Sequence, residues 1–246
     1  HPDHWSRFCM AAGLRLRQKL DETLLQGALN ALIRRHEALR TVYGGPGSAA
    51  WVIPPHDGPW LTLTAPPDST AEMLLPQAVD ALIEQIAPGR GQLFGAALIR
   101  ATGGDILLLA GHHLALDGVS FSVLAEELKR FIAEGHLPEG ADPGPSAWAA
   151  RLAAYSTGPG AAAEKSRWQS LMARTSRMLP LLKAPRPADR IGQRRTHDLA
   201  LNRETLATLT ERSGRRRYGL QGLLLAALGE ALACRLGEGE ILLLLE

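Results

Sequence analysis

The sequence contains little cysteine, almost no excess charge and no long apolar run. Its two cysteines, Cys9 and Cys234, lie too far apart for a metal-ligand spacing or a disulfide framework, so we expect a reducing, cytoplasmic setting. A formal net charge of +2 does not favour a nucleic-acid partner. The apolar run at 241–245 is long enough for a strand only, no apolar run approaches the length of a membrane span, and the first residues lack a signal-peptide pattern. We therefore expect no membrane segment.

The overall composition is that of a globular protein with a sizeable core. The 246 residues are 46% hydrophobic and 21% charged, and the length suits one large domain or two modest ones. The sequence has no glycine-rich loop of the P-loop type and no histidine and cysteine cluster with metal-ligand spacing. Neither a metal site nor a P-loop nucleotide site is therefore predicted.

Strand and helix patterns alternate over residues 1–140, which we interpret as an N-terminal α/β lobe. Asp21 is placed to cap the first helix, and glycines at 44–47 indicate a hairpin turn. The predicted helices cover 21–40, 71–86 and 121–135, and the predicted strands cover 14–17, 41–43, 51–53, 61–64, 92–100 and 105–110.

Residues 141–246 are predicted to hold a linker and the first part of a second lobe. Proline and glycine over 137–145 indicate the linker. The patterns favour helices at 146–155, at 165–173, from Asn202 or Thr205 onward, and at 220–236. The helix at 220–236 is expected to be buried. Strands are expected at 195–201 and 240–246. Because a lone pair of strands cannot bury its faces well, we expect the second lobe to be incomplete in this chain.

The most informative segment runs from Ile106 to Ser120. A buried strand leads into His112 and His113, a tight turn follows at 117–118, and an amphipathic helix begins after it. An imidazole at such a junction can move protons near neutral pH. Because neighbouring strand residues point to opposite faces, we expect a structural His112 and a functional His113. The alternative for His113 is a structural histidine bonded to the backbone.

The segment His112-His113-x-x-x-Asp117-Gly118 resembles the His-His-x-x-x-Asp-Gly signature of the condensation-domain superfamily of nonribosomal peptide synthetases. Chloramphenicol acetyltransferase-like acyltransferases share the signature. Arg35–Arg40 resembles the family's Arg-His-Glu-x-Leu-Arg helix end, and 91–98 is similar to one of its strands. The resemblance implies an α/β (α+β) fold of two lobes, each a mixed sheet flanked by helices.

Further segments resemble the epimerization branch of that superfamily. They are the Pro-Asp-His-Trp opening, Asp117–Phe121, the pair Glu204-Thr205 and the helix 223–228. Residues 242–246 resemble the lead-in to the Glu-Gly-His-Gly-Arg-Glu motif, with Glu246 as its first Glu. The resemblance implies L-to-D epimerization of an aminoacyl or peptidyl thioester on the phosphopantetheine arm of a peptidyl carrier protein. That arm is the only cofactor implied, and neighbouring synthetase modules are expected partners.

The family resemblance assigns the α-proton exchange to His113 and Glu246, acting from opposite faces of the α-carbon. Burial would have to raise the pKa of Glu246 toward neutrality. Backbone N–H groups near Gly118 and Val119 are expected to stabilise the enolate oxygen. Condensation, in which His113 orients or deprotonates an attacking amine, is the alternative reaction. A third hypothesis is a non-catalytic module that docks a carrier protein.

The remaining site residues are expected to support the turn. Asp117 is predicted to pair with Arg40, Arg35 or an arginine of the second lobe, and Gly118 to adopt a backbone angle that other residues resist. Ser120 is expected to cap the helix and, with Val119, to contact substrate. It lacks the Gly-x-Ser-x-Gly elbow of a serine hydrolase.

Overall fold

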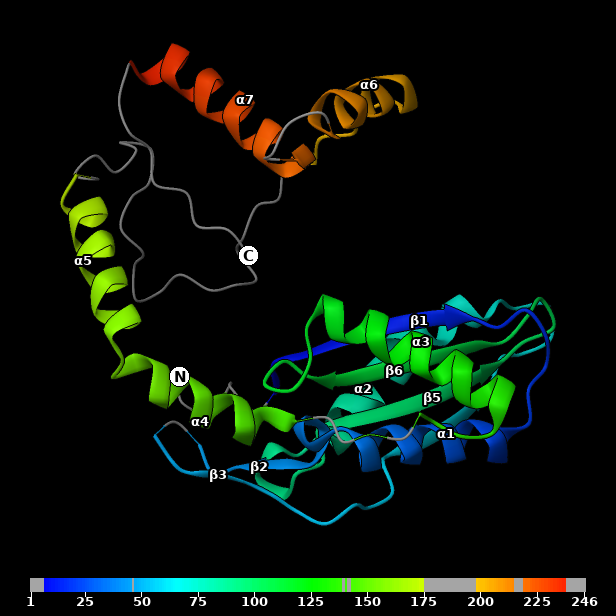
Figure 1. Cartoon of the computed structure of the whole chain (residues 1–246). Coiled ribbons are helices and arrows are strands. Elements are labelled where there is room, and N and C mark those ends of the chain that lie inside the picture. The colour runs from blue at the N-terminus through cyan, green and yellow to red at the C-terminus, as the bar shows by residue number, and fades with distance from the viewer. Residues whose placement is uncertain are drawn as a thin grey trace, which may run out of the picture. The chain divides into compact units, whose positions relative to one another are not determined.

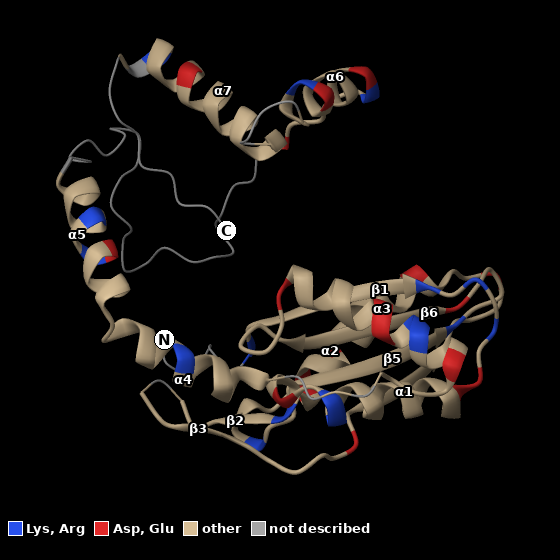
Figure 2. Ribbon diagram, viewed as in Figure 1, with Lys and Arg blue, Asp and Glu red and all other residues tan. Residues whose placement is uncertain are grey.

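The computed structural model describes residues 7–45, 47–138, 140, 143–174, 198–214 and 219–237. The chain forms two compact units, His1–Ala154 and Tyr155–Glu246. The predicted lobes, 1–140 and 141–246, stay a prediction. The first unit is a sheet with helices on both faces (Figure 1). Charges of both signs are interspersed over its helices and loops (Figure 2), in keeping with the small net charge.

A mixed four-stranded sheet forms the centre of the first unit. The strand order is β1 (Cys9–Arg15), β6 (Ile106–His112), β5 (Phe94–Arg100) and β4 (Trp60–Thr64). The pairs β1–β6 and β5–β6 are antiparallel, whereas β4 and β5 are parallel. Strands β5 and β6 are buried almost throughout, which explains their continuous apolar sequences.

Alternate residues of the sheet belong to two hydrophobic clusters. Helices α1 (Glu22–Arg35) and α3 (Gly118–Glu134) cover one face and pack against each other. The 3-10 turn η3 (Ala71–Leu74) and helix α2 (Leu75–Gln85) cover the other face. In Figure 1, α1 and α3 lie in front of the sheet and α2 behind it. Leu107 and Leu109 of β6 face the first pair of helices, so odd-numbered β6 residues point toward α1 and α3.

Several predicted elements are present, with shifted ends. Asp21 caps α1 as predicted, its carboxylate accepting from the amide of Leu24 at 3.0 Å. The prediction that this helix reaches Arg40 is wrong, because His36 is extended (φ −97°, ψ 107°) and a 3-10 turn, η2 (Glu37–Arg40), follows it.

The predicted hairpin forms as β2 (Thr41–Tyr43) and β3 (Ala50–Val52). The predicted strand 14–17 instead begins at Cys9 and ends at Arg15. A further 3-10 turn, η4 (Pro88–Arg90), precedes β5.

After α3, the described part of the chain is helical. Its helices are α4 (Gly144–Ser156), α5 (Pro159–Arg174), α6 (Arg203–Gly214) and α7 (Gly219–Leu236). The predicted burial of 220–236 is wrong for the described side chains, because α7 packs mainly on α6 and leaves Leu224 and Leu228 exposed. Of the predicted strand 195–201, the described residues 198–201 form no strand. The predicted strand 240–246 lies outside the described residues.

Candidate active site

The histidine pair stands at the end of β6, held by strands on either side. The amide of His112 donates to the carbonyl of Leu93 at 2.9 Å, and the amide of His113 donates to the carbonyl of Phe8 at 2.8 Å. His112 is 1% exposed, and its Nδ1 accepts from the amide of Leu114 at 3.1 Å. An Nδ1 that accepts leaves the ring proton on Nε2, so His112 is a buried neutral ring that shapes the turn.

His113 points to the opposite side and is exposed. Its Nδ1 lies 2.7 Å from the carbonyl oxygen of Leu116. A carbonyl oxygen can only accept, so Nδ1 carries a proton and the neutral ring has its lone pair on Nε2. Among the described residues, Nε2 has no hydrogen-bond partner. An oriented imidazole with an open basic nitrogen is what general base catalysis requires.

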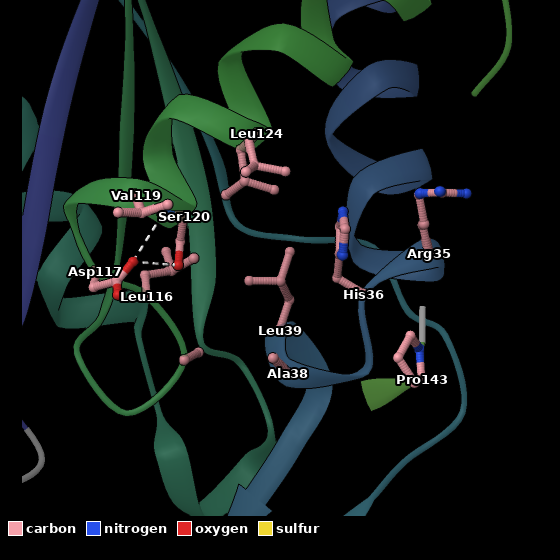
Figure 3. Close-up of a pocket in the computed structure, with 12 residues that line it drawn as sticks. Arg35, His36, Ala38, Leu39, Leu116, Asp117, Val119, Ser120, Leu124 and Pro143 are labelled. Atoms are coloured by element: carbon pink, nitrogen blue, oxygen red, sulfur yellow. Dashed lines mark hydrogen bonds between the residues drawn. The ribbon is translucent and has the colours of Figure 1, made fainter. Parts of the chain in front are cut away.

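Asp117 caps α3 and forms neither of the two ion pairs predicted within the first lobe. One of its carboxylate oxygens accepts from the amide of Ser120 at 2.8 Å and from its hydroxyl at 2.6 Å (Figure 3). The hydroxyl and then the amide of Ser120 are the main reasons that the pKa of Asp117 is lowered. Arg40 donates instead to the carbonyl of Ile53 at 2.6 Å, and Arg35 lies across the pocket from Asp117. A second-lobe arginine stays a prediction.

Two further expectations about this turn need correction. Asp117, not Ser120, is the N-cap of α3, and Ser120 lies in the first helical turn. Gly118 does not have a positive φ, and a Cβ added to it would meet no atom within 4 Å. The amide of Val119 contributes with that of Ser120 to lowering the pKa of Asp117. The expected role of the amides near Gly118 and Val119 in stabilising an enolate oxygen stays a prediction.

Arg35 and His36 are joined by Glu127 of α3, which the sequence analysis did not single out. The two carboxylate oxygens of Glu127 lie 3.0 Å from Nε of Arg35 and 2.6 Å from Nε2 of His36. Arg35 also donates to the carbonyls of Pro138 and Gly140, at 2.7 and 3.0 Å. The Arg-His pair of the Arg-His-Glu-x-Leu-Arg segment therefore fastens α1 to α3 and to the loop after α3.

We expect Glu127→Ala to lower the free energy of unfolding by about 1–3 kcal/mol, because it leaves a partly buried guanidinium and an imidazole without their shared acceptor. Urea unfolding of the purified chain measures this change. Glu126→Ala is the matched control. Its pair with Lys129 is 3.2 Å long with both side chains more than 70% exposed, so its effect should be close to zero. Equal effects of the two substitutions would contradict the anchoring role.

A pocket of about 560 Å³ lies between the end of α1 and the start of α3. Val119 and Ser120, predicted to contact substrate, line it together with Leu116 and Asp117 (Figure 3). His113 is not among its lining residues. The pocket therefore adjoins the turn after the histidines but does not contain the open Nε2 atom.

Glu246, the predicted second proton carrier, lies outside the described residues, as does the opening segment 1–5. Within the described ranges, no group of three or more His, Cys, Asp or Glu side chains is placed to hold a metal ion. None of the helices in those ranges is long and apolar enough to cross a lipid bilayer.

The fold is that of an α/β protein in which helices flank a mixed sheet. Its candidate acid–base site is a histidine pair at the end of a central strand, followed directly by a capped helix. A family model described as "Condensation domain" matches residues 2–241. The chain therefore belongs to the condensation-domain family.

Two curated proteins illustrate the sequence similarity. Malpibaldin synthetase of Mortierella alpina is 34% identical over 127 residues, which are 47% of this chain and 2% of that protein. Tyrocidine synthase 1 of Brevibacillus parabrevis is 28% identical over 189 residues, which are 68% of this chain and 16% of that protein. The chain thus spans only a small part of the length of these curated relatives.

Solved structures agree with the fold. The epimerization domain from the third module of tyrocidine synthetase B has a TM-score of 0.75 and 24% identity, covering 95% of this chain and 56% of that chain. The condensation domain from the Monacolin K polyketide synthase MokA has a TM-score of 0.73 and 19% identity, with the same two coverages. The chain has the mixed α/β fold of these domains and spans about half of their length.

Proposed function

We propose that this chain supplies the histidine of an epimerase acting on an aminoacyl or peptidyl thioester, which is carried on the phosphopantetheine arm of a peptidyl carrier protein. The observation that carries the proposal is the open Nε2 of His113, directed by the hydrogen bond from Nδ1 to the carbonyl of Leu116 at 2.7 Å. Membership of the condensation-domain family and similarity to a solved epimerization domain support the choice of substrate class.

The proposed reaction moves one proton at a time. A thioester carbonyl acidifies the hydrogen on the neighbouring α-carbon, and Nε2 of His113 takes that hydrogen as a proton. The electron pair of the broken C–H bond delocalises onto the thioester oxygen as an enolate. The carboxylic acid of Glu246 then protonates the α-carbon from the opposite face, which inverts its configuration. Proton exchange with water restores the histidine base and the carboxylic acid before the next L substrate.

The phosphopantetheine arm is supplied by the carrier protein in this proposal, and neighbouring synthetase modules supply the carrier. Val119 is 72% exposed and lines the pocket beside the turn, so it is the proposed apolar contact for the arm. Gly118 leaves open space next to it. We propose a cytoplasmic synthetase as the setting.

Condensation is the second candidate, because the family model and a solved condensation domain match the chain as well. The same Nε2 atom would then accept a proton from an attacking α-amine. The amine nitrogen would bond to the thioester carbonyl carbon of the second substrate, the C–S bond would break, and the proton would pass to the departing pantetheine thiolate. Both reactions need the same open imidazole, so the site geometry alone is compatible with either.

The test uses the full polypeptide that carries this chain, with a carrier protein loaded with an L-aminoacyl thioester in deuterated water. We expect deuterium at the α-carbon and a mixture of D and L product after hydrolysis of the thioester. A second carrier loaded with an acceptor amino acid is then added. Amide formation without deuterium uptake would overturn epimerization in favour of condensation. Carrier binding with neither reaction would instead support the non-catalytic docking module.

A further inference from the structure

Phe8, the residue before β1, lies directly across from His113, the residue after β6. The β1–β6 register pairs Cys9 with His112, so the next pair outward is Phe8 and His113. The hydrogen bond from the amide of His113 to the carbonyl of Phe8, at 2.8 Å, continues the pairing by one residue. Side chains directly opposite each other in an antiparallel pair lie on the same face of the sheet and in contact range. The two rings are therefore neighbours because of the backbone pairing.

The two rings are in contact in a tilted arrangement. Their centroids are 4.8 Å apart and their planes meet at 43°, which is within the range of favourable aromatic pairs. The phenyl ring is nevertheless 53% exposed, so it contributes little to the core.

The contacts of His113 act on different degrees of freedom of its side chain. The carbonyl of Leu116 binds Nδ1 at 2.7 Å and selects the tautomer with a basic Nε2. A hydrogen bond at one ring atom still allows the imidazole plane to tilt about it. The phenyl ring of Phe8 blocks part of that tilt from one side, so the contacts together set the direction of the Nε2 lone pair.

We propose that Phe8 is a positioning residue that holds the imidazole of His113 in the orientation required for proton transfer. This inference rests on the proposed function of His113 as the base. Truncation of Phe8 lets the ring turn away from the Leu116 carbonyl, so the tautomer with Nε2 protonated becomes populated. Misplacing a reacting group by about 1 Å can cost about 100-fold in rate. The loss falls on kcat and leaves KM unchanged, since Phe8 acts through the histidine.

The experiment compares Phe8→Ala, Phe8→Leu and Phe8→Tyr with Met73→Ala. Met73 is a matched exposed apolar side chain, 70% exposed, in the η3 turn that covers the opposite face of the sheet. Nitrogen-15 NMR of histidine-labelled protein reports the tautomer of His113, and the chemical shifts of its ring protons report the phenyl ring current. Deuterium exchange at the substrate α-carbon gives kcat and KM for the full polypeptide.

We expect Phe8→Ala to abolish the ring-current shift, to populate both tautomers and to lower kcat about 10- to 100-fold. Phe8→Leu keeps apolar bulk without the ring current and should be intermediate in rate. Phe8→Tyr should restore both readouts, and Met73→Ala should change neither. A Phe8→Ala protein with the wild-type tautomer and wild-type kcat would overturn the proposal.

The positioning role and the proposed function fail separately. If His113→Ala retained proton exchange while Phe8→Ala still altered the His113 tautomer, the proposed function would fall and the positioning contact would stand. If His113 were essential but neither its tautomer nor the rate of proton exchange changed in Phe8→Ala, only the positioning role of Phe8 would be contradicted.

Discussion

His113→Gln is expected to lower the rate of α-proton exchange on the carrier-bound thioester by about 10²- to 10⁴-fold, the usual contribution of a general base. The glutamine amide can form hydrogen bonds at this position but cannot accept a proton near neutral pH. The side chain of His113 is exposed and its backbone amide is held by the carbonyl of Phe8. We therefore expect the variant to fold and to bind the carrier as the wild type does. His113→Ala should show the same loss.

His136 offers a matched control for this prediction. It is also exposed, and its Nδ1 lies 3.2 Å from the carbonyl of Leu137. It therefore resembles His113 in residue type, exposure and local bonding but lies after the end of α3. Exchange measured by mass spectrometry should be unchanged in His136→Ala. Wild-type exchange in His113→Gln would remove His113 from the mechanism.

Gly111→Ala is expected to reduce both stability and activity, because Gly111 has no room for a side chain. An added Cβ would overlap Cδ1 of the Leu116 side chain and would lie 3.0 Å from the backbone carbonyl oxygen of Leu93, which has less freedom to move. The Leu93 carbonyl accepts the amide of His112, and the Leu116 carbonyl orients His113. Overpacking of this kind costs about 1–3 kcal/mol of unfolding free energy. We expect proton exchange to fall more than about 10-fold in the protein that remains folded, since relief of the contact with the Leu93 carbonyl shifts the end of the strand that carries His112 and His113.

Two other glycines provide comparisons for Gly111→Ala. An added Cβ at Gly13 of β1 would make ordinary contacts, the nearest at 3.6 Å, and one at Gly118 would meet nothing within 4 Å. Both alanine variants should unfold at wild-type urea concentrations. Gly13→Ala should also retain wild-type exchange. A loss of exchange confined to Gly118→Ala would indicate that the substrate arm occupies the space beside this residue. A Gly111→Ala protein with wild-type stability and exchange would contradict the packing argument.

The local features of the site could be predicted from short stretches of sequence. The continuous apolar run ending at His112 predicts a buried strand, and the Asp-Gly pair that follows predicts a turn into a helix. Both are present, with α3 beginning at Gly118. The cap at Asp21 and the hairpin over 41–53 were predictable for the same reason. In each case the signal and the structure that it specifies lie within a few residues of each other.

The predicted partners of the turn were less accurate, because side chains compete for the same charged groups. Arg35 was a reasonable partner for Asp117 by charge, but Glu127 binds it and also reaches His36. Asp117 in turn binds Ser120 three residues later. The pairing of opposite charges depends on where the helix ends lie in space, which the spacing of residues in the sequence does not specify.

The sequence by itself determined the order of strand, histidine pair, turn and helix, and with it the family to which the chain belongs. Only the tertiary structure decided which groups surround the imidazole of His113. Phe8 reaches it through the register of β1 on β6, and Glu127 reaches Arg35 across 92 residues of sequence through the packing of α3 on α1. Strand register and helix packing depend on contacts distant in the sequence, and a shift of one residue would place Phe8 on the other face of the sheet.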